Sequence, residues 1–163
     1  MTAAPLFMGI DPGVNGAIGF VDSAGAFVAV FDMPTLTTTT GRKQLDFAQL
    51  AAIVAKHAPA FSLVERVASR PGEGAVGAFA FGMTYGGILG VIGTLAAAHD
   101  LIQPAVWKRK AGIPAGADKG ASIQLAIRLL PAAAPMLTRK KDDGRAEALL
   151  IALQAWERRQ PAA

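Results

Sequence analysis

The sequence predicts a single α/β domain, residues 1–163, built on a mixed five-stranded sheet flanked by helices. Its 163 residues, 52% of them apolar, suffice for one hydrophobic core. Three short apolar runs joined by turns open the chain, and two further apolar runs then alternate with segments of helical periodicity. This order, βββαβαβαα, predicts an antiparallel start followed by alternating strand and helix units in one sheet.

The expected strands are apolar runs of strand length, at residues 6–10, 17–21, 27–31, 61–67 and 101–106. Asp-Pro-Gly at 11–13 follows the first run, and Asp-Ser-Ala-Gly at 22–25 separates the second from the third. Both have the composition of tight turns, so the first three strands should be antiparallel neighbours.

The expected helices show apolar positions at helical spacing, at residues 43–57, 75–98, 118–130 and 142–159. Pro59 and Pro131 stop two of them, and Asp118 is a candidate N-cap. The polar stretch 34–42 is expected to be a mobile loop. The apolar segment 75–98 is interrupted by glycines and threonines, which favours a buried helix over a membrane span.

Three glycines of that segment, Gly82, Gly86 and Gly90, recur every four residues and share one helical face. Glycine costs about 1 kcal/mol relative to alanine inside a helix, so their repetition indicates that another backbone approaches closely. That backbone belongs either to the protein's own sheet or to a second copy of the chain.

The chain contains no cysteine, which excludes disulfides and cysteine-ligated zinc and fits a cytoplasmic location. Its beginning lacks the pattern of a signal peptide. Residues 1–100 hold five Lys/Arg against seven Asp/Glu, whereas residues 101–163 hold eleven against five. The basic half indicates either a polyanionic substrate or an ordinary charged surface.

Four acidic residues, Asp11, Glu65, Asp143 and Glu147, stand at the edges of apolar runs. Glu65 lies inside the run SLVERV, where burial is costly without a partner, and Arg66 would point to the opposite face of a strand. Each residue has a simpler structural explanation as a turn residue, an ion-pair member or a solvated acid. Together, however, rigidly held carboxylates repel one another and need a cation, and oxygen ligands favour Mg²⁺ or Mn²⁺.

The last two acids are four residues apart and therefore share one face of a helix. Asp142 is turned away from that face if the helix begins early, but it replaces Asp143 as a ligand if the helix begins late.

Basic and aromatic side chains near these acids could contact a nucleic acid. The candidates are Lys108, Lys119, Lys140, Lys141, Phe79 and Tyr85. The simpler explanation is surface charge for the lysines and core packing for most of the aromatic residues in this region, which include Phe81.

In their order along the chain, these motifs resemble the RuvC-type Holliday-junction resolvases, of the ribonuclease H-like superfamily. The segments that carry the resemblance are MGIDPGVNGAIGFVD, SLVERV, FGMTYGGILGVI, PAVWKRKAGI, DKGASIQLAIRLLP and KKDDGRAEALLIA. The resemblance covers nearly the whole chain and is closest to the phage and bacterial branch and its chloroplast relatives.

The resemblance implies a ribonuclease H-like sheet, a homodimer and a structure-specific endonuclease that cuts four-way DNA junctions with two Mg²⁺ or Mn²⁺ ions. Asp11, Glu65 and Glu147 match the family's metal ligands, and Asp143 stands where relatives carry histidine or aspartate. Lys108 and Lys119 match basic positions near the DNA. The C-terminal acids are four residues apart here and three apart in the best-known bacterial branch, which leaves the cleavage sequence open.

Three other functions remain open at this point. DPGVNGAIGF also resembles the first phosphate loop of the sugar-kinase and actin-like ATPases, although those proteins need two such domains. A related nuclease could act on RNA or on other branched DNA. A DNA-binding module without catalysis could share the same fold.

Overall fold

The computed structural model describes residues 4–68, 72–96 and 98–160. Its main sheet has the strand order β3-β2-β1-β6-β7. The strands are β1 (Phe7–Asp11), β2 (Ala17–Val21), β3 (Phe27–Asp32), β6 (Phe61–Glu65) and β7 (His99–Ile102). The first three pair antiparallel, whereas β6 pairs in parallel with both β1 and β7. The predicted mixed sheet, with its first three strands antiparallel, is confirmed.

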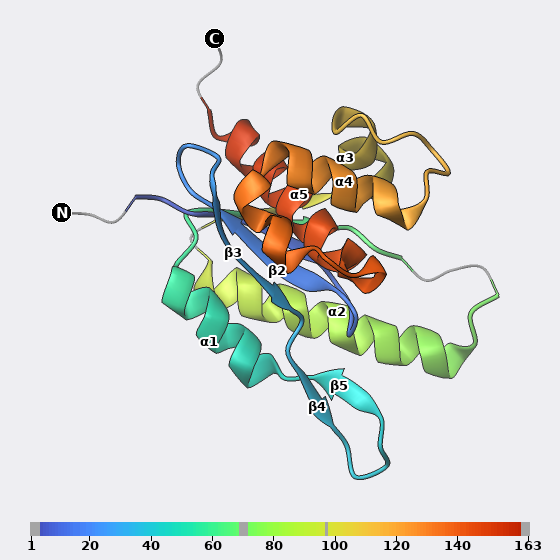
Figure 1. Ribbon diagram of the computed structural model, residues 1–163. Helices are drawn as coiled ribbons and strands as arrows, with labels where there is room; N and C mark the ends of the chain where they lie inside the picture. The colour runs from blue at the N-terminus through green and yellow to red at the C-terminus, as the bar shows by residue number, and fades with distance from the viewer. Residues whose placement is uncertain (1–3, 69–71, 97, 161–163) are drawn as a thin grey trace.

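Helices cover both faces of this sheet (Figure 1). On one face lie α1 (Phe47–His57) and α2 (Ala75–Leu95), and on the other lie α3 (Pro104–Lys110), α4 (Lys119–Leu129) and α5 (Asp143–Arg158). The alternation of strand side chains makes both layers possible, because Phe7 faces the α5 side and Met8 the α1 side. Strands covered on both faces read as continuous apolar runs, which is why the sequence predicted them well.

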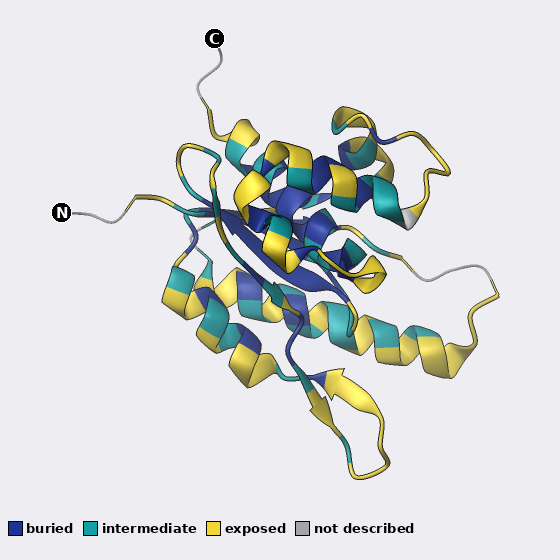
Figure 2. Ribbon diagram, in the orientation of Figure 1, coloured by how far each residue is buried: buried dark blue, intermediate teal, exposed yellow. Residues whose placement is uncertain are grey.

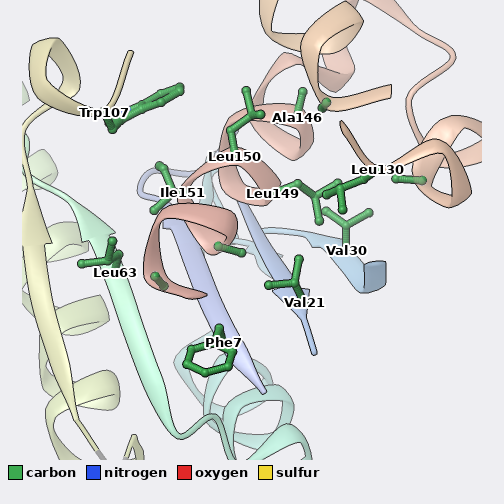
Figure 3. Packing of buried hydrophobic residues seen from close by; sticks show 14 of the residues in the cluster. Phe7, Val21, Val30, Leu63, Trp107, Leu130, Ala146, Leu149, Leu150 and Ile151 are labelled. Atoms are coloured by element: carbon green, nitrogen blue, oxygen red, sulfur yellow. The ribbon is translucent and has the colours of Figure 1, made fainter. Parts of the chain in front are cut away.

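A pair of glycines brings α5 directly onto the sheet. Gly9 of β1 and Gly19 of β2 are partners in the strand register. A Cβ on Gly9 would overlap the backbone of Ala148 and Ala152, and one on Gly19 would lie 2.9 Å from Leu149 N. The apolar side chains around this contact form the core in Figure 3. The glycine pair therefore sets how closely the helix that carries Asp143 and Glu147 approaches the strand that carries Asp11.

Between β3 and α1 the structure differs from the prediction. Residues 34–45 are neither a mobile loop nor the start of a helix, but a hairpin of β4 (Thr35–Thr37) and β5 (Lys43–Leu45) that projects from the body (Figure 1). The threonines are β-branched and favour this extended conformation. Helix α1 begins only at Phe47, because the Asp46 side chain accepts a hydrogen bond from Gln49 N at 2.9 Å and caps the helix.

The prediction that the segment 75–98 is a buried helix is wrong. In α2 only Ile88 and Ile92 are fully buried, and the apolar 18-residue window within it is 11% buried (Figure 2). By length and composition α2 is a helix that could cross a membrane. Nothing lies within 4 Å of a Cβ placed on Gly82, Gly86 or Gly90. Their shared face therefore does not pack on the protein's own sheet.

The second half of the chain follows the prediction with shifted boundaries. The last strand ends at Ile102 rather than Val106, because Pro104 starts the short helix α3. Asp118 caps α4 as expected, accepting a hydrogen bond from Ala121 N at 3.2 Å. The segment between α4 and α5 forms two 3₁₀ turns, η1 (Pro131–Met136) and η2 (Lys140–Asp142).

Candidate active site

Two of the four predicted acids stand at the carboxyl edge of the sheet. Asp11 is the last residue of β1 and Glu65 the last residue of β6. These strands are adjacent and parallel, and the register pairs Ile10 with Val64 just before the two acids. In sheets with helices on both faces, this edge is where ligands and substrates bind.

The other two acids come from the first two turns of α5, which starts at Asp143. Gly144 in its first turn faces Asp11, since a Cβ there would lie 3.1 Å from Asp11 Oδ2 and 3.0 Å from Asn15 O. The start of α5 is therefore packed against the Asp11 carboxylate. Three segments that are far apart in sequence bring their acids to one place.

The charges of these residues act on one another. The pKa of Asp11 is raised to about 8, first by burial and then by the charges of Glu65, Glu147 and Asp143, while Lys108 opposes the shift. Burial also raises the pKa of Glu65, against a hydrogen bond from Trp107 that lowers it. Asp11 thus shares one electrostatic environment with the other three carboxylates, whose charges act against its ionisation.

Asp142, the alternative to Asp143, has a different role. It is buried, with 1% of its side chain exposed, and accepts hydrogen bonds from Arg139 N at 2.8 Å, Nε at 2.9 Å and Nη2 at 2.6 Å. The Arg139 guanidinium holds the pKa of Asp142 below its usual range. Asp142 therefore fixes the turn before α5, whereas Asp143 lines the open cavity beside Asp11.

Two consecutive residues of α3 bind two of the acids, which the sequence did not reveal. The Trp107 indole donates to Glu65 Oε2 at 2.6 Å, and Lys108 Nζ lies 2.8 Å from Glu147 Oε1. Ser122 of α4 also donates to Glu147 Oε1, at 3.3 Å. The sequence pointed to Lys108 only as a nucleic-acid contact. A signal was nevertheless present, because a buried tryptophan needs an acceptor and Glu65 had no assigned partner.

An open cavity of about 900 Å³ extends from Asp11 and Asp143. Lys140 and Lys141 line it on the α5 side, and Lys43 of the projecting hairpin lines it from β5. The lining of the cavity therefore combines acids with three lysines. Lys43 was not among the predicted site residues, because the sequence placed it at the start of a helix.

The remaining predicted contacts are dispersed. Phe79 lies on α2 with 70% of its surface exposed, and Tyr85 is half-buried against the α1 side of the core. Lys119 begins α4, and its side chain lies outside the described part of the structure. Phe81 lines the cavity beside Asp11 and also a smaller one of about 440 Å³ beside Glu65.

The donor chemistry at the site fits a hard divalent cation, because Asp11, Glu65, Asp143 and Glu147 offer only carboxylate oxygens. Among residues 4–68, 72–96 and 98–160, no three acidic or histidine side chains are already placed to hold a metal ion together. Glu65 and Glu147 are engaged within the protein, Glu65 by Trp107 and Glu147 by Lys108 and Ser122.

Fold and site together define a ribonuclease H-like domain with an acidic cluster at the carboxyl edge of its central strands. Two solved structures have this fold. The Thermus thermophilus RuvC structure in complex with a Holliday junction substrate superposes with a TM-score of 0.63 and 16% identity, covering 95% of each chain. Another Thermus thermophilus RuvC structure gives a TM-score of 0.57 and 18% identity, covering 94% of this chain and 95% of that one.

In sequence, the chain is 36% identical over 86 residues to the chloroplastic Holliday junction resolvase MOC1 of Chlamydomonas reinhardtii. The match takes in 53% of this chain and 10% of that relative's length. No protein-family model matches the chain. The resemblance to RuvC-like resolvases is thus confirmed for the fold over nearly the whole chain and for the sequence over about half of it.

Proposed function

We propose that this protein is a Holliday-junction resolving endonuclease, which hydrolyses DNA phosphodiester bonds at four-way junctions with the help of divalent cations. The observation that carries the proposal is the acidic cluster, in which the partly buried Asp11 is repelled by Glu65, Glu147 and Asp143. Carboxylates that repel one another at a sheet edge are the expected state of a cation site without its cations. The RuvC fold and the similarity to MOC1 support the junction as substrate.

The proposed reaction adds water across one bond. The oxygen of water attacks the phosphorus, the bond from phosphorus to the 3′ oxygen breaks, and the products are a 5′-phosphate and a 3′-hydroxyl. Two Mg²⁺ or Mn²⁺ ions, when bound, would supply an activated water and neutralise the charge on the leaving 3′ oxygen. Asp11 would contribute to holding them together with Glu65, Asp143 and Glu147, since the charges of all three act on it.

The lysines of the cavity would bind the DNA backbone. Lys43, Lys140 and Lys141 line the space that begins at Asp11, so a strand that enters it passes between the hairpin and the start of α5. Lys108 has a second role in this proposal, because it balances the charge of Glu147 before the cations bind.

The proposal includes a homodimer, because a four-way junction presents two equivalent strands. The exposed face of α2 supports this. Val76, Phe79 and Met83 are 79, 70 and 62% exposed, and the glycines of the same helix leave room for another backbone. Such a continuous apolar surface is typical of an interface. Binding of DNA, formation of a dimer and binding of two cations are three parts of the proposal, and each is tested by its own experiment.

Cleavage of labelled DNA tests the activity. A synthetic four-way junction and a linear duplex with the same arm sequences are incubated with the protein in Mg²⁺ or in a chelator. We expect paired nicks in the junction with Mg²⁺, none with the chelator, and none in the duplex. Binding of the junction without nicking in Mg²⁺ and in Mn²⁺ would favour a non-catalytic module.

The same assay separates the remaining alternatives. A panel with flap DNA and an RNA–DNA hybrid shows whether another branched or hybrid substrate is cut faster than the junction. The ATPase alternative predicts heat release when ATP is titrated into the protein, and we expect none.

A further inference from the structure

We propose that Trp107 is a positioning residue, whose indole N–H fixes the Glu65 carboxylate so that its other oxygen is presented to a cation. The inference rests on the cation site of the proposed function, but not on the identity of the DNA substrate. It starts from a short hydrogen bond at the site, 2.6 Å between Trp107 Nε1 and Glu65 Oε2.

The surroundings make this hydrogen bond rigid. Trp107 is fully buried, and Glu65 is 8% exposed. The indole is anchored in the core on the α5 side of the sheet, in the region of Leu63 and Ile151 (Figure 3). A packed tryptophan has two side-chain torsions fixed by its neighbours, whereas a glutamate has three to fix. The fixed indole ring therefore restricts the orientation of the more flexible glutamate side chain.

The hydrogen bond also selects one oxygen. An indole N–H is a donor only, so it uses one lone pair of Oε2 and leaves both lone pairs of Oε1 to a cation. A hydrogen bond to a charged acceptor is stronger than a neutral one, and burial strengthens it further. The hydrogen bond thus holds the carboxylate in one orientation.

Helix α3 is well placed for this task. It follows β7, and β7 pairs in parallel with β6 so that Ile102 lies opposite Glu65. Successive residues of a helix point about 100° apart, so Trp107 reaches Glu65 while Lys108 reaches Glu147. One short helix therefore orients acids from β6 and from α5.

The chain contains a matched control. Trp156, the second of its two tryptophans, donates its indole N–H to Ser23 O at 3.0 Å, where it contacts the turn at Gly25. It has the same chemistry as Trp107 but no acid as acceptor. Trp107→Phe and Trp156→Phe each remove one indole N–H while an aromatic ring remains.

Nuclear magnetic resonance of the ¹⁵N-labelled protein tests the contact directly. Trp156→Phe assigns the two indole N–H resonances. We expect the Trp107 resonance to shift in Glu65→Gln and during a Mg²⁺ titration without DNA, while the Trp156 resonance stays in place. A Trp107 resonance that responds to neither change overturns the proposal. This experiment needs no cleavage and no folded Trp107 variant.

Metal binding by calorimetry, also without DNA, tests the consequence. Trp107→Phe should bind Mn²⁺ roughly tenfold more weakly than the parent, as expected when the group that orients a metal ligand is lost. Trp156→Phe should bind it unchanged. In cleavage, the Trp107→Phe defect should shrink as the Mn²⁺ concentration rises. Unchanged Mn²⁺ affinity with a uniform loss of cleavage would reduce Trp107 to a packing residue.

The two proposals can fail independently. If the protein cuts no junction but the Trp107 resonance and Mn²⁺ affinity respond as stated, the substrate assignment fails and the positioning role stands. If junctions are cut but neither the Trp107 resonance nor the Mn²⁺ affinity responds, the substrate assignment stands and the positioning role fails.

Discussion

Helices α2 and α5 are the two longest in the domain, and they use their apolar residues in opposite ways. Helix α5 has 16 residues, nine of them buried, whereas α2 has 21 residues with two buried. Figure 2 shows α5 enclosed between the sheet and its neighbours, and α2 with much of its length exposed. Apolar composition alone therefore does not tell which helix belongs to the core.

The glycines explain the difference. Around α5 they lie in the strands, where Gly9 and Gly19 let the helix backbone touch the sheet. In α2 they lie in the helix itself, where Gly82, Gly86 and Gly90 face open space. The first arrangement closes the core and sets the geometry of the acidic cluster. The second leaves a surface for a partner, which the proposal assigns to a second copy.

The largest expected effect is on folding, in a comparison of two Gly→Ala substitutions. Gly9→Ala should lower the free energy of unfolding by about 3 kcal/mol, because its Cβ overlaps the α5 backbone. Gly86→Ala should leave the monomer unchanged or stabilise it by up to about 1 kcal/mol, because it meets nothing and favours the helix. Urea denaturation of both variants measures this. Equal destabilisation would mean that the two glycines have the same role.

The acidic cluster should make stability depend on pH. The pKa of Asp11 is about 8 in the folded protein, against an ordinary value of 3.8 that applies to the unfolded chain. Between these pH values the unfolded chain loses the proton that the folded protein keeps, so the free energy of unfolding falls as pH rises. Asp11→Asn removes this loss. Without divalent cations it should raise the free energy of unfolding by on the order of 2 kcal/mol at pH 9, with a gain that fades toward pH 4.

Denaturation of the parent and of Asp11→Asn at several pH values, in a chelator, measures this dependence. Mg²⁺ should reduce the gain at pH 9, because it compensates the charge that the substitution removes. A difference between the two proteins that is constant with pH would contradict the electrostatic account of the cluster.

On the α2 side, a charge in the exposed face should weaken self-association. Met83→Glu places a carboxylate on a side chain that is 62% exposed in the monomer. If this face forms the dimer, the dissociation constant should rise at least about tenfold, equivalent to about 1.4 kcal/mol, in sedimentation measurements. Gly86→Leu should act in the same direction by keeping the backbones apart.

Leu129→Glu is the matched control, since Leu129 is a half-exposed apolar residue at the end of α4. It should leave the sedimentation behaviour unchanged. A dimer that survives both α2 variants would have to use another surface.

The smallest expected effect on stability belongs to a comparison of the neighbouring acids Asp142 and Asp143. Asp142→Asn loses the ion pair with Arg139 that precedes α5, so its melting temperature should fall by about 3 °C while cleavage persists. Asp143→Asn should abolish cleavage without lowering the melting temperature. Thermal unfolding and the junction assay of both variants decide this, and a reversal of the two phenotypes would move the ligand to Asp142.

Much of the fold was predictable from the sequence because β1, β2 and β6 are covered on both faces and read as continuous apolar runs. The hairpin at Thr35–Thr37 and Lys43–Leu45 was not predictable, because a small exposed hairpin has no pattern of alternating buried apolar residues. Its threonines are also common in loops. The burial of α2 was predicted wrongly, since an apolar segment looks the same whether its own domain or a partner covers it.

The candidate site shows the same limit. The four acids were found because charged residues at the ends of apolar runs are costly, whatever the tertiary structure. The side chains that contact these acids were not found. Trp107 and Glu65 are 42 positions apart, and the sequence does not show which side chains meet. Asp142 and Asp143 could be distinguished only when the start of α5 was seen, since that start decides which one faces Asp11.

Cleavage of a labelled four-way junction in Mg²⁺ by Asp11→Asn and Glu65→Gln, with Glu157→Gln as control, tests the central claim most directly. Glu157 is an exposed acid of α5 paired with Lys110, away from the cluster. Asp11→Asn and Glu65→Gln should bind the junction in mobility-shift assays but leave it uncut, whereas Glu157→Gln should cut like the parent. Full nicking by Asp11→Asn or Glu65→Gln would contradict the assignment of the acidic cluster as the catalytic site.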